Sequence, residues 1–378
     1  GQYIADGSDD SMEIIKEFEA RYPHIKVNYS TYDSNEIMYS KLSNGGITVD
    51  VIIPSDYMIG RMIEEDMLDK VNECYIHLSY AIAIRTKLLI VTPTPQKVES
   101  LLRTKLPSSL IEKITIYKCP TNDTWARDHG PITCLSPDGK IQLLDFRFNG
   151  WGGKFEAYLD NKITQSLHSA NIISGDYVDH LDFELEGGSI ESDGQGTLLT
   201  TSECLLNPNR NPNLSKEIIE ERLKEWFGLE RILWLDHGFL AGDDTDSHID
   251  TLARLCPNNT IAYVKCTDPT DEHYEALKEM EQQLQTFTTL EGTPYKLVPL
   301  PMAAPTYDED GHRLPATYAN YLVLNHTILY PTYGTPQLDE QAAQQLAKAF
   351  PGYDLVDIDC TALIQQHGSL HCATMQLY

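Results

Sequence analysis

The chain has 378 residues, of which 41% are hydrophobic and 22% charged, and its formal net charge is -27 at pH 7. This length and composition predict a folded globular protein of one large or two smaller domains, and they exclude wholesale disorder. The acidity argues against nucleic acid or an anionic membrane as a partner and favours a cationic ligand. Acidity that only serves solubility is the alternative.

The sequence offers neither a membrane anchor nor a disulfide framework. No apolar run reaches the length of about 18 residues that a transmembrane helix needs, and no basic-then-apolar leader is seen. The eight cysteines show no paired spacing and stand at positions 74, 119, 134, 204, 256, 266, 360 and 372. Scattered cysteines in a large acidic chain indicate a reducing compartment, so we expect a cytoplasmic protein.

The first seventy residues alternate between helical and extended patterns. The predicted elements are a helix over 11–22, a strand over 25–30, a helix over 35–42 and a strand over 49–53. This alternation is typical of an α/β unit with parallel strands.

The same region contains two distinctive stretches, YSTYDSNEIMYSKL (29–42) and DVIIPSDYMIGRMIEEDML (50–68). They resemble the front of a periplasmic polyamine-binding protein of the spermidine/putrescine uptake type. The resemblance covers residues 9–70 and implies that Ser55 and Tyr57 contact a polyamine. That family needs two complete lobes to close over its ligand, and nothing after residue 72 continues it. We therefore interpret residues 1–71 as an α/β fragment of a solute-binding-protein lobe, attached by fusion or mis-join.

A different, uniform character begins near residue 72 and continues to the end, which predicts one domain over 72–378. Its predicted helices cover 73–84, 97–106, 217–227, 271–284 and 339–350. Its predicted strands cover 87–92, 114–117, 141–145, 181–185, 231–235, 261–264, 296–300, 321–324 and 327–330. Short strands that alternate with helices indicate several α/β modules.

A cysteine near the C-terminus is the candidate nucleophile. Cys372 lies in the stretch GSLHCATMQ (368–376), next to a histidine that could help to keep a thiol deprotonated. A buried structural cysteine is the alternative. Three other stretches favour the catalytic interpretation, because each places a carboxylate or an imidazole beside glycine or a turn: WARD (125–128), EGGSIE (186–191) and SHID (247–250).

The acidic segment 243–250 also permits a metal site. Its candidate ligands are Asp243, Asp244, Asp246, His248 and Asp250. A hydrolytic metal site usually draws two or three histidines, and no second histidine motif of that kind is present. We therefore expect no metal and no cofactor.

A thiol, an imidazole and several carboxylates without a metal suit one kind of electrophile, a cationic carbon centre. Carboxylates hold the planar N–H groups of a guanidinium by paired charge-assisted bonds. A thiolate attacks the central carbon, and a histidine moves protons to the departing amine and from water. Carboxylates raise the pKa of a nearby thiol, so the bound cation itself would favour the thiolate.

Several motifs then indicate a family. They are TNDTWARDHGP (121–131), FNGWGGKF (148–155), ELEGGSIE (184–191), LLNPNRNP (205–212), SHIDTLARL (247–255) and GSLHCATMQ (368–376). With them, residues 72–378 resemble the agmatine deiminases of the guanidine-modifying superfamily. The resemblance implies a five-bladed α/β propeller with Cys372 as nucleophile and His248 as acid/base. It also implies that Asp128 and Asp250 grip the guanidinium, that Glu186 supports the imidazole and substrate, and that Trp125 lines the pocket.

The implied reaction is a cofactor-free hydrolysis of agmatine to N-carbamoylputrescine and ammonia through a covalent thiouronium on cysteine. It belongs to polyamine metabolism and putrescine biosynthesis. A peptidylarginine deiminase is the near alternative, and a polyamine-binding protein without turnover is the distant one. The expected partner is a small cation, with neither nucleic acid nor membrane, and the sequence leaves a homo-oligomer open.

The chain departs from this family at its front. Members open with a short strand and a Trp-Pro turn that complete one blade, whereas this chain carries the polyamine-binder fragment instead. We therefore expect the first blade to be altered.

Overall fold

The computed structural model describes residues 69–136, 138–308 and 310–378. The chain divides into two compact units, Gly1–Asn72 and Glu73–Tyr378. The elements predicted between residues 11 and 53, and the expected polyamine contacts Ser55 and Tyr57, lie outside the described residues. In the part that is described, no helix is both long and apolar enough to cross a bilayer.

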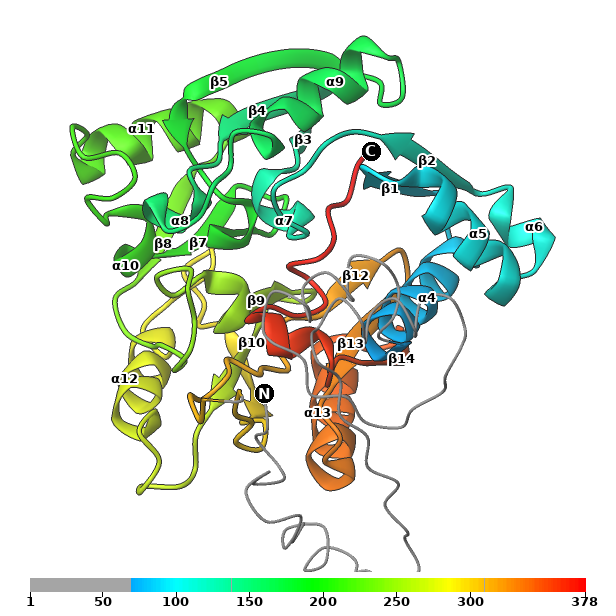
Figure 1. Cartoon of the computed structure of the whole chain (residues 1–378). Helices are drawn as coiled ribbons and strands as arrows, with labels where there is room; N and C mark the ends of the chain where they lie inside the picture. The colour runs from blue at the N-terminus through cyan, green and yellow to red at the C-terminus, as the bar shows by residue number, and fades with distance from the viewer. Residues whose placement is uncertain (1–68, 137, 309) are drawn as a thin grey trace, which may run out of the picture. The chain divides into compact units, whose positions relative to one another are not determined.

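The second unit is built from five small sheets, four of which share one strand pattern (Figure 1). In each of the four, the first two strands pair antiparallel and the second pairs parallel with the third. The strands are β3 (Ile132–Leu135), β4 (Ile141–Arg147) and β5 (Asp176–Glu184); β6 (Ile190–Ser192), β7 (Thr197–Thr201) and β8 (Arg231–Leu235); β9 (Ala253–Cys256), β10 (Thr260–Lys265) and β11 (Lys296–Pro301); and β12 (Leu322–Leu324), β13 (Thr327–Thr332) and β14 (Asp354–Asp359).

The parallel pair in each sheet requires a crossover, and helices supply it. The main connecting helices are α9 (Ile163–Ser169), α11 (Lys216–Phe227), α12 (Tyr274–Leu284) and α13 (Pro336–Ala349). Helix α11 begins one residue before its predicted start and ends at the predicted residue. Ser215 accepts a hydrogen bond from the backbone N–H of Ile218, and Gly228 closes the helix in the left-handed conformation at φ 64°. Repetition of this module gives the predicted five-bladed α/β propeller.

The remaining sheet contains only two of the described strands. Helix α4 (Asp69–Ala83) precedes β1 (Leu88–Thr92), which pairs parallel with β2 (Ile114–Lys118) across α5 (Pro95–Lys105) and α6 (Ser108–Ile111). Among the described residues, no antiparallel strand joins this sheet, whereas each of the other four has one. The residues before α4 lie outside the described part, so the expected loss of the family's opening strand stays a prediction.

Apolar side chains of the central strands make the core. Every residue of β10 except the last is buried, and α12 covers it with Leu277, Met280 and Leu284 at helical spacing. The strands that the sequence prediction missed are short or partly polar: β3, β6, β7, β9 and β14. Strand β14, DLVDID, contains three Asp among its six residues, without a regular alternation, so its pattern does not mark a strand.

Candidate active site

The segment that carries Cys372 is folded back into the interior of the second unit. It follows β14 and the short 3₁₀ helix η4 (Leu363–Gln366), and Cys372 is only 8% exposed. The backbone N–H of Arg127 donates to the carbonyl of Cys372 at 3.0 Å. This contact docks the C-terminal segment on the WARD turn, so two motifs from opposite ends of the unit meet here.

Asp128 lies in the short helix α7 (Ala126–His129) and is held by two donors. Its Oδ1 accepts from the backbone N–H of Gly188 at 3.0 Å, and its Oδ2 accepts from Nε1 of Trp151 at 2.9 Å. Trp151 reaches it from a left-handed backbone conformation, φ 54°. Burial, and then the nearby Asp250, raise the pKa of Asp128 well above its usual range.

Trp125, the residue expected to line the pocket, packs against the nucleophile's own segment. A Cβ placed on Gly368 would lie 2.4 Å from a carbon of the Trp125 ring, so only glycine permits this close approach. Trp125 is buried in the core, and its position supports the segment 368–376. Its contact with substrate stays a prediction.

His248 comes directly before the 3₁₀ helix η3 (Ile249–Thr251), at the end of a strained turn. Asp246 and Ser247 adopt left-handed conformations, φ 63° and 65°, that L-residues rarely take. Among the described residues, neither ring nitrogen of His248 has a hydrogen-bond partner. Nδ1 lies 3.6 Å from Oδ1 of Asp128. Burial lowers the pKa of this imidazole well below its usual value, and the charge of Arg210 lowers it further.

Asp250 lies two residues after His248, within η3, and its two carboxylate oxygens differ in their hydrogen bonding. Oδ2 lies 2.6 Å from Nδ1 of His371 and 4.0 Å from the Cys372 sulfur, whereas the buried Oδ1 has no hydrogen-bond partner in the described part of the chain. Burial raises the pKa of Asp250 to about 7, against the opposing effect of Arg254 and Arg127. Burying a carboxylate oxygen without a hydrogen-bond donor costs free energy, and a bound cationic ligand would supply that donor.

Glu186 forms a buried ion pair with Arg210. Nε of Arg210 donates to both carboxylate oxygens at 3.0 and 2.9 Å, and both side chains are almost fully buried. Arg210 also donates to Asp246 at 2.7 Å and to the carbonyl of Thr245 at 2.9 Å. Arg210 therefore ties the EGGSIE turn to the loop that carries His248, and the predicted support of the imidazole by Glu186 stays untested.

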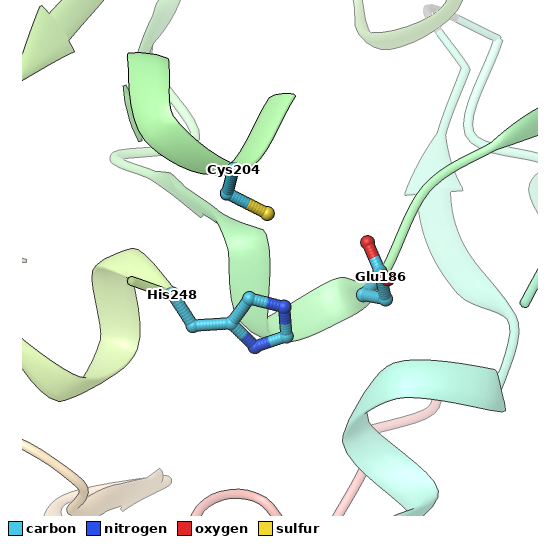
Figure 2. A group of neighbouring side chains, drawn as sticks. All are labelled: Glu186, Cys204 and His248. Atoms are coloured by element: carbon cyan, nitrogen blue, oxygen red, sulfur yellow. The ribbon is translucent and has the colours of Figure 1, made fainter. Parts of the chain in front are cut away.

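Among the residues that the structure describes, two groups of side chains have ligand atoms close enough for a metal. In Figure 2, the side chains of Glu186, Cys204 and His248 point toward one another, and their ligand atoms lie within 4.8 Å. This donor set does not suit a metal, because the Arg210 guanidinium already supplies the positive charge at Glu186. The other group, on a partly exposed turn, consists of Asp308, Asp310 and His312.

The carboxylates of 243–250 are directed to separate partners. Asp243 accepts from the backbone N–H groups of Thr245 and Ser247 within its own turn. Asp246 pairs with Lys154 at 2.8 Å and with Arg210, and Asp250 contacts His371. These three carboxylates therefore shape the loop or the site and do not converge on one ion.

Gly188 marks the point where the predicted site residues meet. A Cβ placed on it would lie 2.6 Å from Nδ1 of His248, 2.8 Å from Oδ1 of Asp128 and 3.2 Å from Oδ2 of Asp250. Cys372 lies against the same Asp250. The structure thus brings together four predicted residues from the WARD, SHID and C-terminal motifs around one glycine of the EGGSIE motif.

Three residues of the site were not predicted: Trp151, Arg210 and Asn320. The first two lie within the motifs FNGWGGKF and LLNPNRNP, whose glycines and asparagines mark unusual backbone paths. Asn320 lies in no motif, and its side-chain contacts with His371 and Cys372 in the structure reveal it. A residue that acts through a contact so distant in sequence leaves no local signal.

In the described part of the chain, a buried thiol lies near two carboxylates and an imidazole whose ring nitrogens have no hydrogen-bond partner. This is the arrangement expected of a cysteine-dependent enzyme that acts on a cationic electrophile, here on an α/β propeller. The chain belongs to the Porphyromonas-type peptidyl-arginine deiminase family, whose model matches residues 56–377.

Relatives and solved structures agree with this family. A protein from Marinomonas sp. (strain MWYL1) named "Putative agmatine deiminase" is 33% identical over 324 residues, which cover 80% of this chain and 85% of that protein. The structure of the "Putative Arginine Deiminase" from Porphyromonas gingivalis is 49% identical with a TM-score of 0.78, covering 82% of this chain and 90% of that one. An agmatine deiminase from C. jejuni, solved with substrate bound, is 39% identical with a TM-score of 0.73, covering 82% and 87%.

Proposed function

We propose that this chain hydrolyses agmatine to N-carbamoylputrescine and ammonia, as an agmatine deiminase. The observation that carries the proposal is the convergence of Cys372, His248, Asp128 and Asp250 around Gly188. Relatives named as agmatine deiminases support the choice of substrate. All four catalytic candidates are buried, which favours a small substrate over a folded protein chain.

In the proposed mechanism, the empty site holds a neutral thiol. Burial raises the pKa of Cys372 well above its usual range, and the charges of Asp250 and Asp128 raise it further. A bound guanidinium reverses the local charge, so the thiol proton passes to His248 and the thiolate forms when substrate is present. The Asp128 carboxylate, 3.6 Å from Nδ1 of His248, would stabilise the imidazolium.

The thiolate then attacks the guanidinium carbon and forms the S–C bond. The C–N bond breaks as His248 returns the proton to the departing nitrogen, which leaves as ammonia. The free Oδ1 of Asp250 and the carboxylate of Asp128 hold the remaining N–H groups. Water gives a proton to His248, adds to the thiouronium carbon and releases N-carbamoylputrescine from the sulfur.

Ammonia release from agmatine tests this function directly. We expect turnover of agmatine, unaffected by a chelator, and little release from a peptide with a C-terminal arginine. The peptide is the relevant comparison because the matching family is named for peptidyl-arginine deiminases. Turnover of the peptide alone would reassign the substrate. Polyamine binding without any ammonia release would support the solute-binding alternative, which the relatives do not favour.

Gly188→Ala should reduce kcat/KM for agmatine by about 100-fold or more, because the added methyl group would displace His248 or Asp128. Steady-state ammonia release measures the loss. The control is Gly194→Ala, at a position where a Cβ meets nothing within 4 Å. Gly194 has φ 65°, so its variant should lose some stability and retain kcat/KM. Unchanged kinetics in Gly188→Ala would place the guanidinium elsewhere.

Agmatine affinity should fall as the pH is lowered through about 7. Asp250, with its pKa raised to about 7, must lose its proton to hold a cation, and Asp128 is raised in the same direction. Agmatine itself keeps both positive charges below about pH 9. The dissociation constant in Cys372→Ser, which lacks the titrating thiol, should rise up to about tenfold per pH unit for each carboxylate. Equal dissociation constants at about pH 6 and 8 would contradict a guanidinium held by these carboxylates.

Three further points remain proposals from the sequence. They are a cytoplasmic location, a homo-oligomeric assembly, and the origin of residues 1–71 as a fragment of a polyamine-binding protein. The same proposal places the boundary between this fragment and the deiminase domain at residue 72.

A further inference from the structure

The imidazole of His371 lies between a carboxylate and a guanidinium, and these two neighbours fix the position of its proton. Nδ1 lies 2.6 Å from Oδ2 of Asp250, and Nε2 lies 3.2 Å from Nη2 of Arg254. Burial, and then the charges of Arg127 and Arg254, lower the pKa of His371 well below its usual value, so the ring is neutral. Because an arginine can only donate, Nε2 accepts, and Nδ1 carries the proton and donates it to Asp250.

Arg254 is held in place by three further hydrogen bonds. Its Nε donates to Glu191 at 3.0 Å, and its Nη1 donates to the carbonyls of Ala319 at 2.9 Å and Tyr321 at 2.8 Å. The guanidinium also lies 4.5 Å from the centre of the Tyr321 ring. Turning Nη2 away from His371 would break these contacts, so the buried ion pair with Glu191 fixes the imidazole tautomer.

This tautomer makes the two oxygens of Asp250 unequal. Oδ2 accepts from His371, whereas Oδ1 has no hydrogen-bond partner within residues 69–136, 138–308 and 310–378. Since Nδ1 already brings a proton to Oδ2, a proton that Asp250 takes up goes to Oδ1. A guanidinium N–H would bind to the same Oδ1. Protonation and cation binding therefore compete for one oxygen atom.

Other charged and titratable groups face Asp250 and His371 from several elements. They are Arg127 and Asp128 on α7, Glu191 on β6, Asp243 and His248 before η3, Arg254 on β9, and Cys372. All of them remain when the His371 side chain is replaced. A change in the proton affinity of Asp250 in such a variant thus reports the loss of one hydrogen bond.

We propose that His371 is a positioning residue, whose Nδ1–H holds Oδ2 of Asp250 and leaves Oδ1 as the oxygen that binds a guanidinium N–H. Its role in binding agmatine rests on the proposed deiminase function. Its tautomer and its contact with Asp250 do not, because both can be measured without a substrate.

The test is the pH dependence of agmatine binding, by calorimetry, in His371→Phe combined with Cys372→Ser. Phenylalanine keeps a ring of similar size and removes the donor, so the ionised form of Asp250 loses a stabilising hydrogen bond. We expect the pH midpoint of binding to rise by about one unit and the dissociation constant at about pH 7 to rise about five- to tenfold. The difference should narrow toward about pH 9, where Asp250 is ionised in both chains.

His371→Asn is the conservative variant, because an asparagine amide can donate from the place of Nδ1. It should restore the midpoint of the chain that carries Cys372→Ser alone. A midpoint that rises equally in His371→Asn and His371→Phe would overturn the proposal, since the donor would then not be what matters.

His273→Phe, also combined with Cys372→Ser, is the matched control. His273 is equally buried, with Nδ1 2.6 Å from Oδ1 of Asp271 and Nε2 accepting from the backbone N–H of Ala241 at 2.8 Å. Its variant loses the same kind of imidazole outside the candidate site, so it should lose stability and keep the midpoint of agmatine binding. A midpoint that rises in both phenylalanine variants, or in neither, would contradict the role of His371.

Nuclear magnetic resonance of the ¹⁵N-labelled histidine rings gives an independent measurement should His371→Phe fold poorly. Without agmatine, the original chain should show His371 protonated on Nδ1 and unprotonated on Nε2 from about pH 6 to 8. A proton on Nε2, or a doubly protonated ring, would overturn the proposal. The expected tautomer in a chain that binds no agmatine at any pH would confirm the contact with Asp250 and refute the substrate assignment.

Discussion

Cys372→Ser is expected to abolish turnover of agmatine, with kcat at least about 1,000-fold lower. The hydroxyl of serine is a much weaker nucleophile, and His248 is too weak a base in this buried position to deprotonate it. Asp128 and Asp250, which hold the guanidinium in the proposed mechanism, remain in the variant, so substrate should still bind. Ammonia release and the binding of agmatine by calorimetry measure the two effects separately.

Chemical modification gives a second measurement of the same point. A thiol alkylator should inactivate the original chain by labelling Cys372, and agmatine should protect it. Cys134→Ser is the control, since Cys134 lies on strand β3 and packs against a hydrophobic cluster that contains none of the site residues. That variant should keep nearly full activity and the same inactivation rate. Substantial turnover by Cys372→Ser would exclude covalent catalysis through this residue.

His248→Ala should stop the reaction at or before the covalent adduct, with a loss in kcat of about 100- to 10,000-fold. Both ring nitrogens of this buried imidazole lack hydrogen-bond partners among the described residues, and it lies beside Gly188 with the site carboxylates, so it is placed to move protons. Mass spectrometry of the quenched variant should show either unmodified Cys372 or a trapped adduct on it.

The control is His168→Ala, which removes a partly buried imidazole from helix α9. It should retain turnover. Equal turnover by His248→Ala would assign the proton transfers elsewhere. His371 is then the next candidate, although Asp250 and Arg254 already occupy its two ring nitrogens.

Much of the site could be predicted because its residues lie in short motifs. Cys372, His248, Asp128 and Asp250 each stand beside glycine or a turn, and their chemistry together suits a guanidinium. Periodic patterns also predicted the longer helices, such as α11 and α12. In helices of this length the helical spacing of apolar residues recurs over several turns. A strand such as β6, with three residues, is too short to show a periodic pattern.

The contacts that orient those residues could not be predicted. The hydrogen bond from Trp151 to Asp128 depends on a left-handed backbone conformation, and the pairing of Arg210 with Glu186 depends on two blades meeting. Asn320 reaches Cys372 from a backbone segment whose flanking carbonyls accept hydrogen bonds from Arg254. Such contacts follow from the packing of whole sheets, which no local pattern encodes.

The consecutive left-handed residues Asp246 and Ser247 imply a conflict between thermal stability and rate. Each such residue costs on the order of 1 kcal/mol unless it is glycine. Glycine at position 247 would relieve that cost, yet it would also let the segment before His248 sample other conformations. Directed evolution of this chain for thermal stability alone should therefore select substitutions in this turn, and these substitutions should slow the enzyme. A screen that rewards turnover at high temperature should leave the turn intact and find its gains elsewhere.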